Sequence, residues 1–283
     1  MSRKTSGAFS EFWEIVKTLL WAAVIAIVIR TFAYEPFNIP SGSMIPTLLV
    51  GDYLFVSKTA YGYSRFSFPG GIVPVEGRIW EGAPKRGDVV VFRPPGEPET
   101  DFIKRVIGLP GDRIQMRAGV LNINGEAVQR QRVEDFVDPD DPTERPIPQY
   151  LETLPGGVTH PVIEAEGDLG GLDDTPTYVV PPDHYFMMGD NRDRSNDSRM
   201  WDESRLQTSS TDEDQAALKA AKLQAEIDAG KTDWLGKVGF VPKENLIGPA
   251  KILFWSYGSE FRWYNPVTWV TALRFGRLLN VIE

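Results

Sequence analysis

The chain of 283 residues has a net charge of -9 at pH 7, 42% hydrophobic residues and no cysteine. This apolar content is enough for a packed core, and the lack of cysteine excludes disulfides, thiolate metal sites and cysteine catalysis. The negative net charge argues against nucleic acid as the main partner, because phosphate binding needs a clustered basic face. The two histidines, His160 and His184, leave little material for a zinc site or a histidine-based triad.

One segment near the N-terminus is far more apolar than the rest. Residues 18–29 contain no charge, and the segment 12–34 is long enough to cross a hydrocarbon core of ~30 Å as a helix. Lys17 and Arg30 lie where long basic side chains can reach the interface. A cleaved leader would need a small-x-small site, but RTFAYEPF follows, and a buried helix of a soluble protein is the other alternative. The pattern favours a tail over 1–11 and a membrane anchor over 12–34.

The basic residues around this segment indicate its orientation. Arg3, Lys4 and Lys17 precede the apolar run, and Arg30 lies at its far end. Under the positive-inside rule this modest bias favours an N-terminus inside and the rest of the chain outside.

The region after the anchor, 35–283, reads as an antiparallel β-rich domain with loop-rich and helical insertions. Asn124-Gly125 is a good two-residue hairpin turn. Segments rich in β-branched and aromatic residues, separated by Gly and Pro, predict strands at 53–57, 88–92, 101–107, 113–116 and 120–128.

Two stretches differ from this pattern. Residues 131–174 hold twelve acidic residues but only Arg132 and Arg145 as basic partners, so we expect an exposed, loop-rich insertion in which short strands can occur. A solvated surface is favoured there over an acidic docking site. Residues 208–230 begin with a capping box and consist of helix formers, which predicts an inserted surface helix in preference to a partner-binding one.

The C-terminal segment mixes aromatic and basic residues. Trp255, Trp263, Trp269 and Phe275 lie among three arginines. Such a mixture suits a membrane interface, but the same aromatic side chains could close the β core. The sequence leaves both interpretations open.

The segment 39–48, IPSGSMIPTL, places two serines around a glycine directly after the anchor. Pro40 and Pro46 fix φ on both sides, so the loop can expose a hydroxyl and let backbone N–H groups converge on a substrate oxygen. An ordinary Ser/Gly turn is the alternative.

Lys104 lies in a strand-like apolar stretch, where a lysine is unexpected. On a strand it shares its face with Phe102 and Val106 and should point toward the core or a cleft. Desolvation there lowers the lysine pKa and suits a general base, whereas a lysine that reaches solvent would have no such role.

The segment 187–199, MMGDNRDRSNDSR, is turn-like and rich in hydrogen-bonding groups that could orient a lysine. Asp190, Asp193 and Asp197 resemble half of a calcium loop, but Ser198 and Ser204 stand where glycine and glutamate are required, so no metal site is expected there. Nucleophile-elbow and Ser-x-x-Lys signatures are absent from the sequence.

Together these blocks resemble the bacterial type I signal peptidases (leader peptidases), which are Ser/Lys-dyad serine endopeptidases. PSGSMIPTL, FIKRVIGLPGD and MGDNRDRSNDSR occur in the family's order, with GDYLFVSK and KRGDVVVF between the first two. The resemblance covers the anchor, most of 36–130 and about 178–255. It implies a membrane-bound enzyme that cleaves N-terminal signal peptides from exported preproteins after small residues, through an acyl-enzyme. It further implies a single-pass protein of the plasma (inner) membrane with its catalytic domain on the extracytoplasmic face, contacting preproteins and membrane lipid, and no metal or cofactor.

The resemblance also assigns roles to individual residues. Ser43 is the implied nucleophile and Lys104 the general base, with the oxyanion held by the Ser43 N–H and the Ser41 hydroxyl. Ser195 is expected to hydrogen-bond the lysine amine, and Asp197 to support it by pairing with Arg199 or Arg105. Substrate is expected to add as a strand beside 36–40 and 100–103, against Phe37, Ile39, Pro40, Phe102 and Ile103.

Three alternatives stay open at this stage. A self-cleaving repressor of the related Ser/Lys class would carry a helix-turn-helix in place of the anchor, and none is visible in the sequence. A catalytically inactive tethered scaffold and a processing protease with few substrates fit the same motifs. The stretch 202–236 is longer than usual for the family, and one anchor is evident where some members have two.

Overall fold

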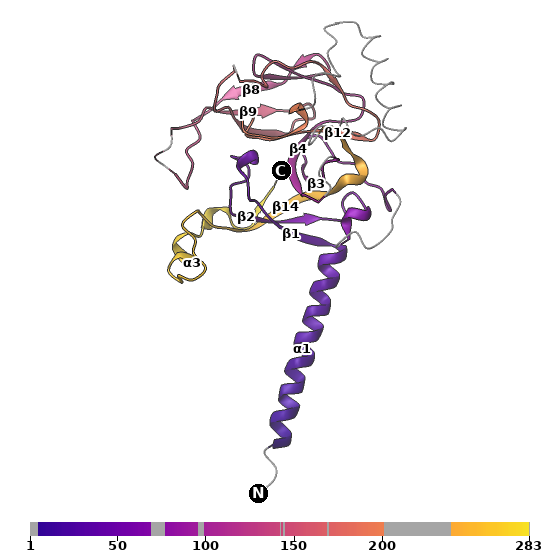
Figure 1. Cartoon of the computed structure of the whole chain (residues 1–283), viewed down its shortest axis with the longest axis vertical. Helices are drawn as coiled ribbons and strands as arrows, with labels where there is room; N and C mark the ends of the chain where they lie inside the picture. The colour runs from indigo at the N-terminus through magenta and orange to yellow at the C-terminus, as the bar shows by residue number, and fades with distance from the viewer. Residues whose placement is uncertain are drawn as a thin grey trace.

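The computed structural model describes residues 5–68, 77–95, 99–141, 143, 145–168, 170–200 and 239–282. In Figure 1 a long N-terminal helix, α1, leads away from a β-rich body. The helix predicted over 208–230 lies outside the described residues.

Helix α1 covers Thr5–Phe32, and its part Phe9–Phe32 is long and apolar enough to cross a membrane, with a mean hydropathy of 2.0. None of that most apolar stretch is buried against the protein, which does not fit the alternative of a soluble core helix. The helix starts inside the predicted tail 1–11 and ends before the predicted boundary at residue 34. It ends there because Tyr34 already pairs with Ser57 in the first strand pair.

The main sheet has eight strands, and all its neighbours pair antiparallel, which confirms the predicted mostly β fold. Strands β3 and β4 are buried on both faces, because Val89, Val91 and Ile103 pack in one core cluster and Val90, Phe92 and Val106 in another. The order is β1 (Tyr34–Asn38), β2 (Asp52–Ser57), β14 (Leu246–Ser256), β3 (Val89–Phe92), β4 (Phe102–Gly108), β12 (His184–Met188) and β13 (Val241–Pro242), with β15 (Asn280–Val281) paired to β14.

Two smaller antiparallel sheets complete the described β structure. Asn124 and Gly125 both have positive φ, at 56° and 86°, and connect β6 to β7 as the expected tight turn. One sheet has the order β11 (Tyr178–Val179), β5 (Arg113–Arg117), β6 (Val120–Ile123) and β7 (Glu126–Ala127), and the other β10 (Thr159–Ile163), β9 (Gln149–Thr153) and β8 (Gln129–Arg132).

The insertion 131–174 is more ordered than its composition predicted. Strands β9 and β10 form a hairpin within it, and three of its acidic residues, Glu152, Glu164 and Asp173, are buried. The expectation of a solvated acidic surface is therefore wrong for these residues. The reason is that Glu152 is paired by Arg192, which lies outside the insertion, in the segment after β12.

The C-terminal aromatic residues do not close the core. Trp255, Trp263, Trp269 and Phe275 are all exposed, the last three around the short helix α3 (Thr268–Thr271). Figure 1 shows α3 on the side of the β body from which α1 leaves. The arrangement fits the alternative of a membrane interface.

The core beside the first strand pair fixes the segment that carries Ser43. Met44 and Leu48 are fully buried in a cluster with Leu54, Val56 and residues of β3 and β14. Burying side chains of this size stabilises the folded state by roughly 1.5–3 kcal/mol each. Packing of Met44 and Leu48 in the core therefore fixes the position of the loop.

Candidate active site

Ser43 and Lys104 meet although 61 residues separate them. Ser43 lies in the single 3-10 turn η1 (Gly42–Met44), and Lys104 lies in β4, where it is paired with Val90. The Lys104 Nζ donates to Ser43 Oγ at 2.5 Å, and the two residues are only 3% and 7% exposed. Lys104 therefore points into the protein, as its strand position predicted.

The surroundings of Lys104 favour its neutral form. The pKa of its ammonium group is lowered from 10.5 to about 8, mainly by burial and to a smaller extent by Arg199. The carboxylates of Asp197 and Asp190 act in the opposite direction and do not restore the ordinary value. A substantial fraction of the amine is thus unprotonated slightly above neutrality, as a general base requires.

The loop around Ser43 is held by the segment that follows β12. Asn191 donates from its backbone N–H to Ser43 O and from Nδ2 to Gly42 O, both at 3.1 Å. Thr47 Oγ1 donates to Asp190 Oδ2 at 2.6 Å. These three bonds fix both ends of the turn that presents the Ser43 hydroxyl.

Gly189 allows this close approach. A Cβ at position 189 would lie 2.2 Å from Ser195 Oγ and 2.5 Å from Ser43 O, so any side chain would push the two segments apart. Ser195 is buried beside this point but makes no hydrogen bond to Lys104, in contrast to the role implied for it. Its hydroxyl lies close to Gly189 and helps to lower the pKa of Asp197.

Asp197 pairs with Arg199, not with Arg105. The Arg199 guanidinium donates to both Asp197 oxygens, at 3.0 and 2.9 Å, and the Gly189 N–H adds a third bond at 3.0 Å. Burial opposes ionisation of Asp197, but Arg199 outweighs it and lowers the pKa of this carboxyl. Asp197 thus remains a carboxylate beside the dyad.

Arg105 pairs with Asp190. Its Nε and Nη2 donate to the two Asp190 oxygens at 2.9 and 2.8 Å, and both side chains are buried. Burial would raise the pKa of Asp190, but Arg105 and His160 hold it far below its usual range. Since Asp190 also accepts from Thr47, it links β4 to the nucleophile loop.

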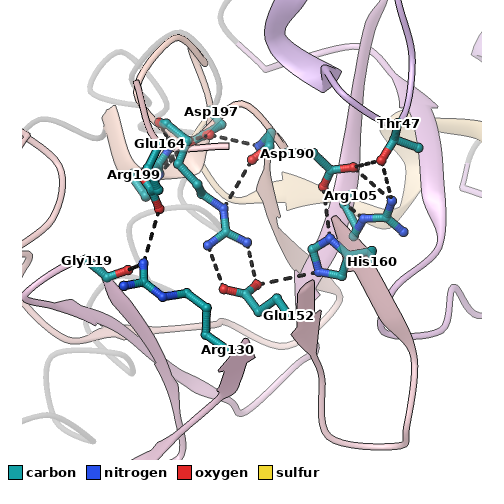
Figure 2. Close-up of polar contacts among 12 residues, drawn as sticks. Thr47, Arg105, Gly119, Arg130, Glu152, His160, Glu164, Asp190, Asp197 and Arg199 are labelled. Carbon is teal, nitrogen blue, oxygen red and sulfur yellow. Dashed lines mark hydrogen bonds and ion pairs between the residues drawn. The ribbon is translucent and has the colours of Figure 1, made fainter. Parts of the chain in front are cut away.

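The β9–β10 hairpin adds further buried charged side chains to this network, and the sequence did not predict them (Figure 2). Arg192 donates to both Glu152 oxygens, at 2.9 and 2.5 Å. His160 lies between Glu152 and Asp190, with ring nitrogens 3.5 and 3.3 Å from their oxygens. Glu152 and His160 belong to no motif. The one signal in the sequence is an acidic and a basic residue at inward-facing positions of two neighbouring strands, β9 and β10.

A cleft of about 760 Å³ opens beside the dyad. It is lined by the end of β1, the loop that follows and the start of β4. All five predicted substrate-contact residues line it together with Ser41, Ser43 and Lys104, namely Phe37, Ile39, Pro40, Phe102 and Ile103. The cleft therefore places the predicted substrate-contact residues and the Ser43 hydroxyl along one common surface.

The chain was compared with known proteins. The sequence profile of the family described as signal peptidase, peptidase S26, matches residues 12–255. A signal peptidase I of Rickettsia canadensis is 33% identical over 281 residues, 93% of this chain and 91% of the relative. One of Rickettsia typhi is 34% identical over 273 residues, 90% and 88% of the two chains. A solved signal peptidase I from Enterococcus faecalis V583 is 22% identical, covers 59% of this chain and 96% of its own, and has a TM-score of 0.28, too low to carry an argument.

Proposed function

The chain belongs to the signal peptidase family, peptidase S26, and from that membership we propose that it cleaves signal peptides with Ser43 as nucleophile and Lys104 as general base. The family makes it a hydrolase and a serine protease that acts on preproteins. The observation that carries the dyad is the 2.5 Å hydrogen bond between Lys104 Nζ and Ser43 Oγ.

In the first half of the reaction, Ser43 Oγ attacks the scissile carbonyl carbon while neutral Lys104 takes the hydroxyl proton. The negative charge that develops on the carbonyl oxygen is stabilised by the Ser43 N–H and the Ser41 hydroxyl, each such donor contributing roughly 3 kcal/mol. The tetrahedral intermediate then collapses, and the C–N bond breaks. The leaving amine takes the proton back from Lys104, which leaves the signal peptide as an ester of Ser43.

In the second half, Lys104 is neutral again and takes a proton from a water molecule. The resulting hydroxide attacks the ester carbonyl, and Ser43 leaves with the proton that Lys104 returns. The hydrogen bonds of Asp190 and Asn191 support this mechanism. They hold the Ser43 loop in place, so the nucleophile is positioned before the substrate reacts.

The substrate segment is proposed to bind extended in the cleft. Strand β1 forms one edge of the main sheet, and the cleft runs on from its end past Ile39 to Ile103 of β4. Addition of a peptide strand along this wall would supply backbone hydrogen bonds, and Ile39 and Ile103 are proposed to line the sites for the small residues before the scissile bond.

A synthetic preprotein tests this function. We expect the purified protein to cleave it once, after its small-x-small site, as identified by mass spectrometry of both fragments. A matched substrate with leucine in place of the small residue before the bond should be cleaved about 100-fold more slowly, because its side chain does not fit. Absence of cleavage, or cleavage that ignores this replacement, would contradict the proposal and favour an inactive scaffold or another specificity.

We further propose that α1 anchors the protein once in the plasma membrane, with the short N-terminal tail in the cytoplasm and a peptidase domain over 35–283 outside. The exposed apolar surface of α1 and the basic residues before it support this orientation. In sealed inverted vesicles, whose cytoplasmic face points outward, added protease should leave residues 40–283 intact until detergent is present. Digestion of the domain in intact inverted vesicles would reverse the topology.

A further inference from the structure

Three carboxylates from separate parts of the chain converge beside the β10 end of the network. Glu164 directly follows β10, Asp173 ends the insertion, and Asp193 belongs to the segment that holds the nucleophile loop. One oxygen of each lies within 4.8 Å of the other two. Glu164 and Asp173 are 0% and 1% exposed, while Asp193 is half-buried and connects the cluster to solvent.

The two buried members have oxygens without partners. Neither Glu164 Oε1 nor Oε2 accepts a hydrogen bond, and Asp173 Oδ1 accepts none either. Glu164 Oε1 has only a long ion pair with Arg130, at 3.7 Å, whereas Glu164 Oε2 and Asp173 Oδ1 have no hydrogen-bond partner. Buried polar groups almost always have a partner, so these unsatisfied carboxylate oxygens in one place point to a bound species that completes them.

The arginines near the cluster are committed to other carboxylates. Arg130 lies 3.7 Å from Glu164 but is bound at 2.8 Å to Asp168, and Figure 2 shows it also donating to Gly119. Arg192 binds Glu152 through both its terminal nitrogens. Arg199 is likewise bound by two nitrogens to Asp197. Burial, with the nearby carboxylates of Asp193 and Asp173, raises the pKa of Glu164 to about 8 despite the attraction of Arg192 and Arg199.

Gly170 leaves open the space between the carboxylates. A Cβ at position 170 would lie 2.8 Å from Asp193 Oδ1 and 3.1 Å from Asp173 Oδ2. It would also lie 3.6 Å from an oxygen of Glu166, a fourth carboxylate. The backbone N–H groups of Glu166 and Gly170 bind Asp193 Oδ2 and Asp173 Oδ2, and so fix both carboxylates.

We propose that Glu164, Asp173 and Asp193 bind a divalent cation of the calcium type. Calcium takes oxygen ligands at 2.3–2.6 Å in irregular arrangements, so two of its ligands can lie up to about 5 Å apart, whereas magnesium restricts them to about 4.2 Å. Three carboxylates with oxygens within 4.8 Å of one another suit calcium, because magnesium is usually held by only one or two carboxylates. Sequence inspection missed the site because Glu164 and Asp173 lie about 20–30 residues from Asp193, far outside a calcium-loop spacing.

Such an ion would tie the end of the insertion to the segment that positions Ser43. Backbone hydrogen bonds already join the two: Ile163 N donates to Asp190 O and Arg192 N to Ile163 O. The ion therefore crosslinks elements that are already adjacent, and its expected effect is on stability and not on the chemical step.

Calcium binding to the chelator-treated full-length protein in detergent tests the proposal. We expect one heat-producing site in titration calorimetry, and a melting temperature raised by about 5–10 °C at a hundredfold excess of calcium over Kd. Both responses should be lost in Glu164→Gln and Asp173→Asn. They should persist in Glu126→Gln, which makes the same chemical change at an exposed position of β7.

Two further variants keep the test decisive where a buried change unfolds the protein. Asp193→Asn alters the half-buried ligand, and Gly170→Ala blocks the space without changing charge; each should weaken calcium binding at least tenfold. If wild-type protein shows neither heat nor a shift in melting temperature, a proton on Glu164 holds the cluster and the proposal is wrong. It is equally wrong if Glu164→Gln and Asp193→Asn bind calcium like wild type.

Discussion

Replacing Ser43 by alanine, or Lys104 by methionine, should each lower kcat/KM by about 10⁴-fold or more while the protein stays folded. The serine change removes the attacking atom, and the lysine change removes the group that takes its proton. The two losses should not add in the double variant, because the residues act as a unit. Cleavage of the synthetic preprotein under single-turnover conditions measures the effect.

Stability measurements separate loss of the base from unfolding. Burial lowers the Lys104 pKa from 10.5 to about 8, which corresponds to roughly 3 kcal/mol against the charged form at neutral pH. Methionine has no charge to desolvate, so Lys104→Met should melt at or above the wild-type temperature. A variant that is both inactive and much less stable would not support the assignment.

The pH dependence identifies the base independently. Only the neutral amine accepts the Ser43 proton, so wild-type kcat/KM should rise with pH up to about 8 and then level off. His160→Gln can lower the rate through the Asp190 network, and His184→Gln should have no effect, but neither should move this limb. A limb near the ordinary imidazole value of ~6.5 that disappears in either variant would mean that histidine is the base.

The sequence suggests the proposed dyad because Ser43 and Lys104 each stand in a contiguous motif that resembles one of the signal peptidase family; local pattern alone left an ordinary turn and a solvent-reaching lysine open. Alternation along β4 places Lys104 with Val106 on an inward face, and two prolines confine the Ser43 loop. The long apolar helix and the β6–β7 hairpin were predictable because apolar length and the Asn-Gly turn are local signals.

The support of the dyad could not be predicted in this way. Glu152 and His160 reach Asp190 from another sheet, and their burial depends on Arg192, which lies beyond the insertion. The composition of a segment gives only the charges that are close in the sequence, whereas Glu152 is paired with an arginine 40 residues away. The hydrogen bond expected from Ser195 to Lys104 is not present, and the Ser195 hydroxyl acts on Asp197 instead; no sequence pattern distinguishes these two neighbours.

Asp190→Asn should lower the free energy of unfolding by about 3–5 kcal/mol. The asparagine cannot compensate the fully buried Arg105, and an uncompensated buried charge has an effect of this size. At about 2–4 °C per kcal/mol for a chain of this length, the melting temperature should fall by roughly 6–20 °C. Because the Thr47 bond also weakens, kcat should fall more than KM rises. Thermal unfolding and steady-state kinetics measure the two effects.

Asp135→Asn is the matched control, since Asp135 pairs with Arg132 on the surface, where an ion pair contributes at most about 1 kcal/mol. The double variant Arg105→Met/Asp190→Leu separates the effect of an unpaired buried charge from the effect of lost packing. Removing both charges should destabilise the protein less than Asp190→Asn alone, because no buried ion is left unpaired. If Asp190→Asn lowers the free energy of unfolding no more than Asp135→Asn does, the buried pair does not hold the nucleophile loop to β4. If the double variant is the least stable, the loss comes from packing around Thr47 and Gly87 and not from the charge on Arg105.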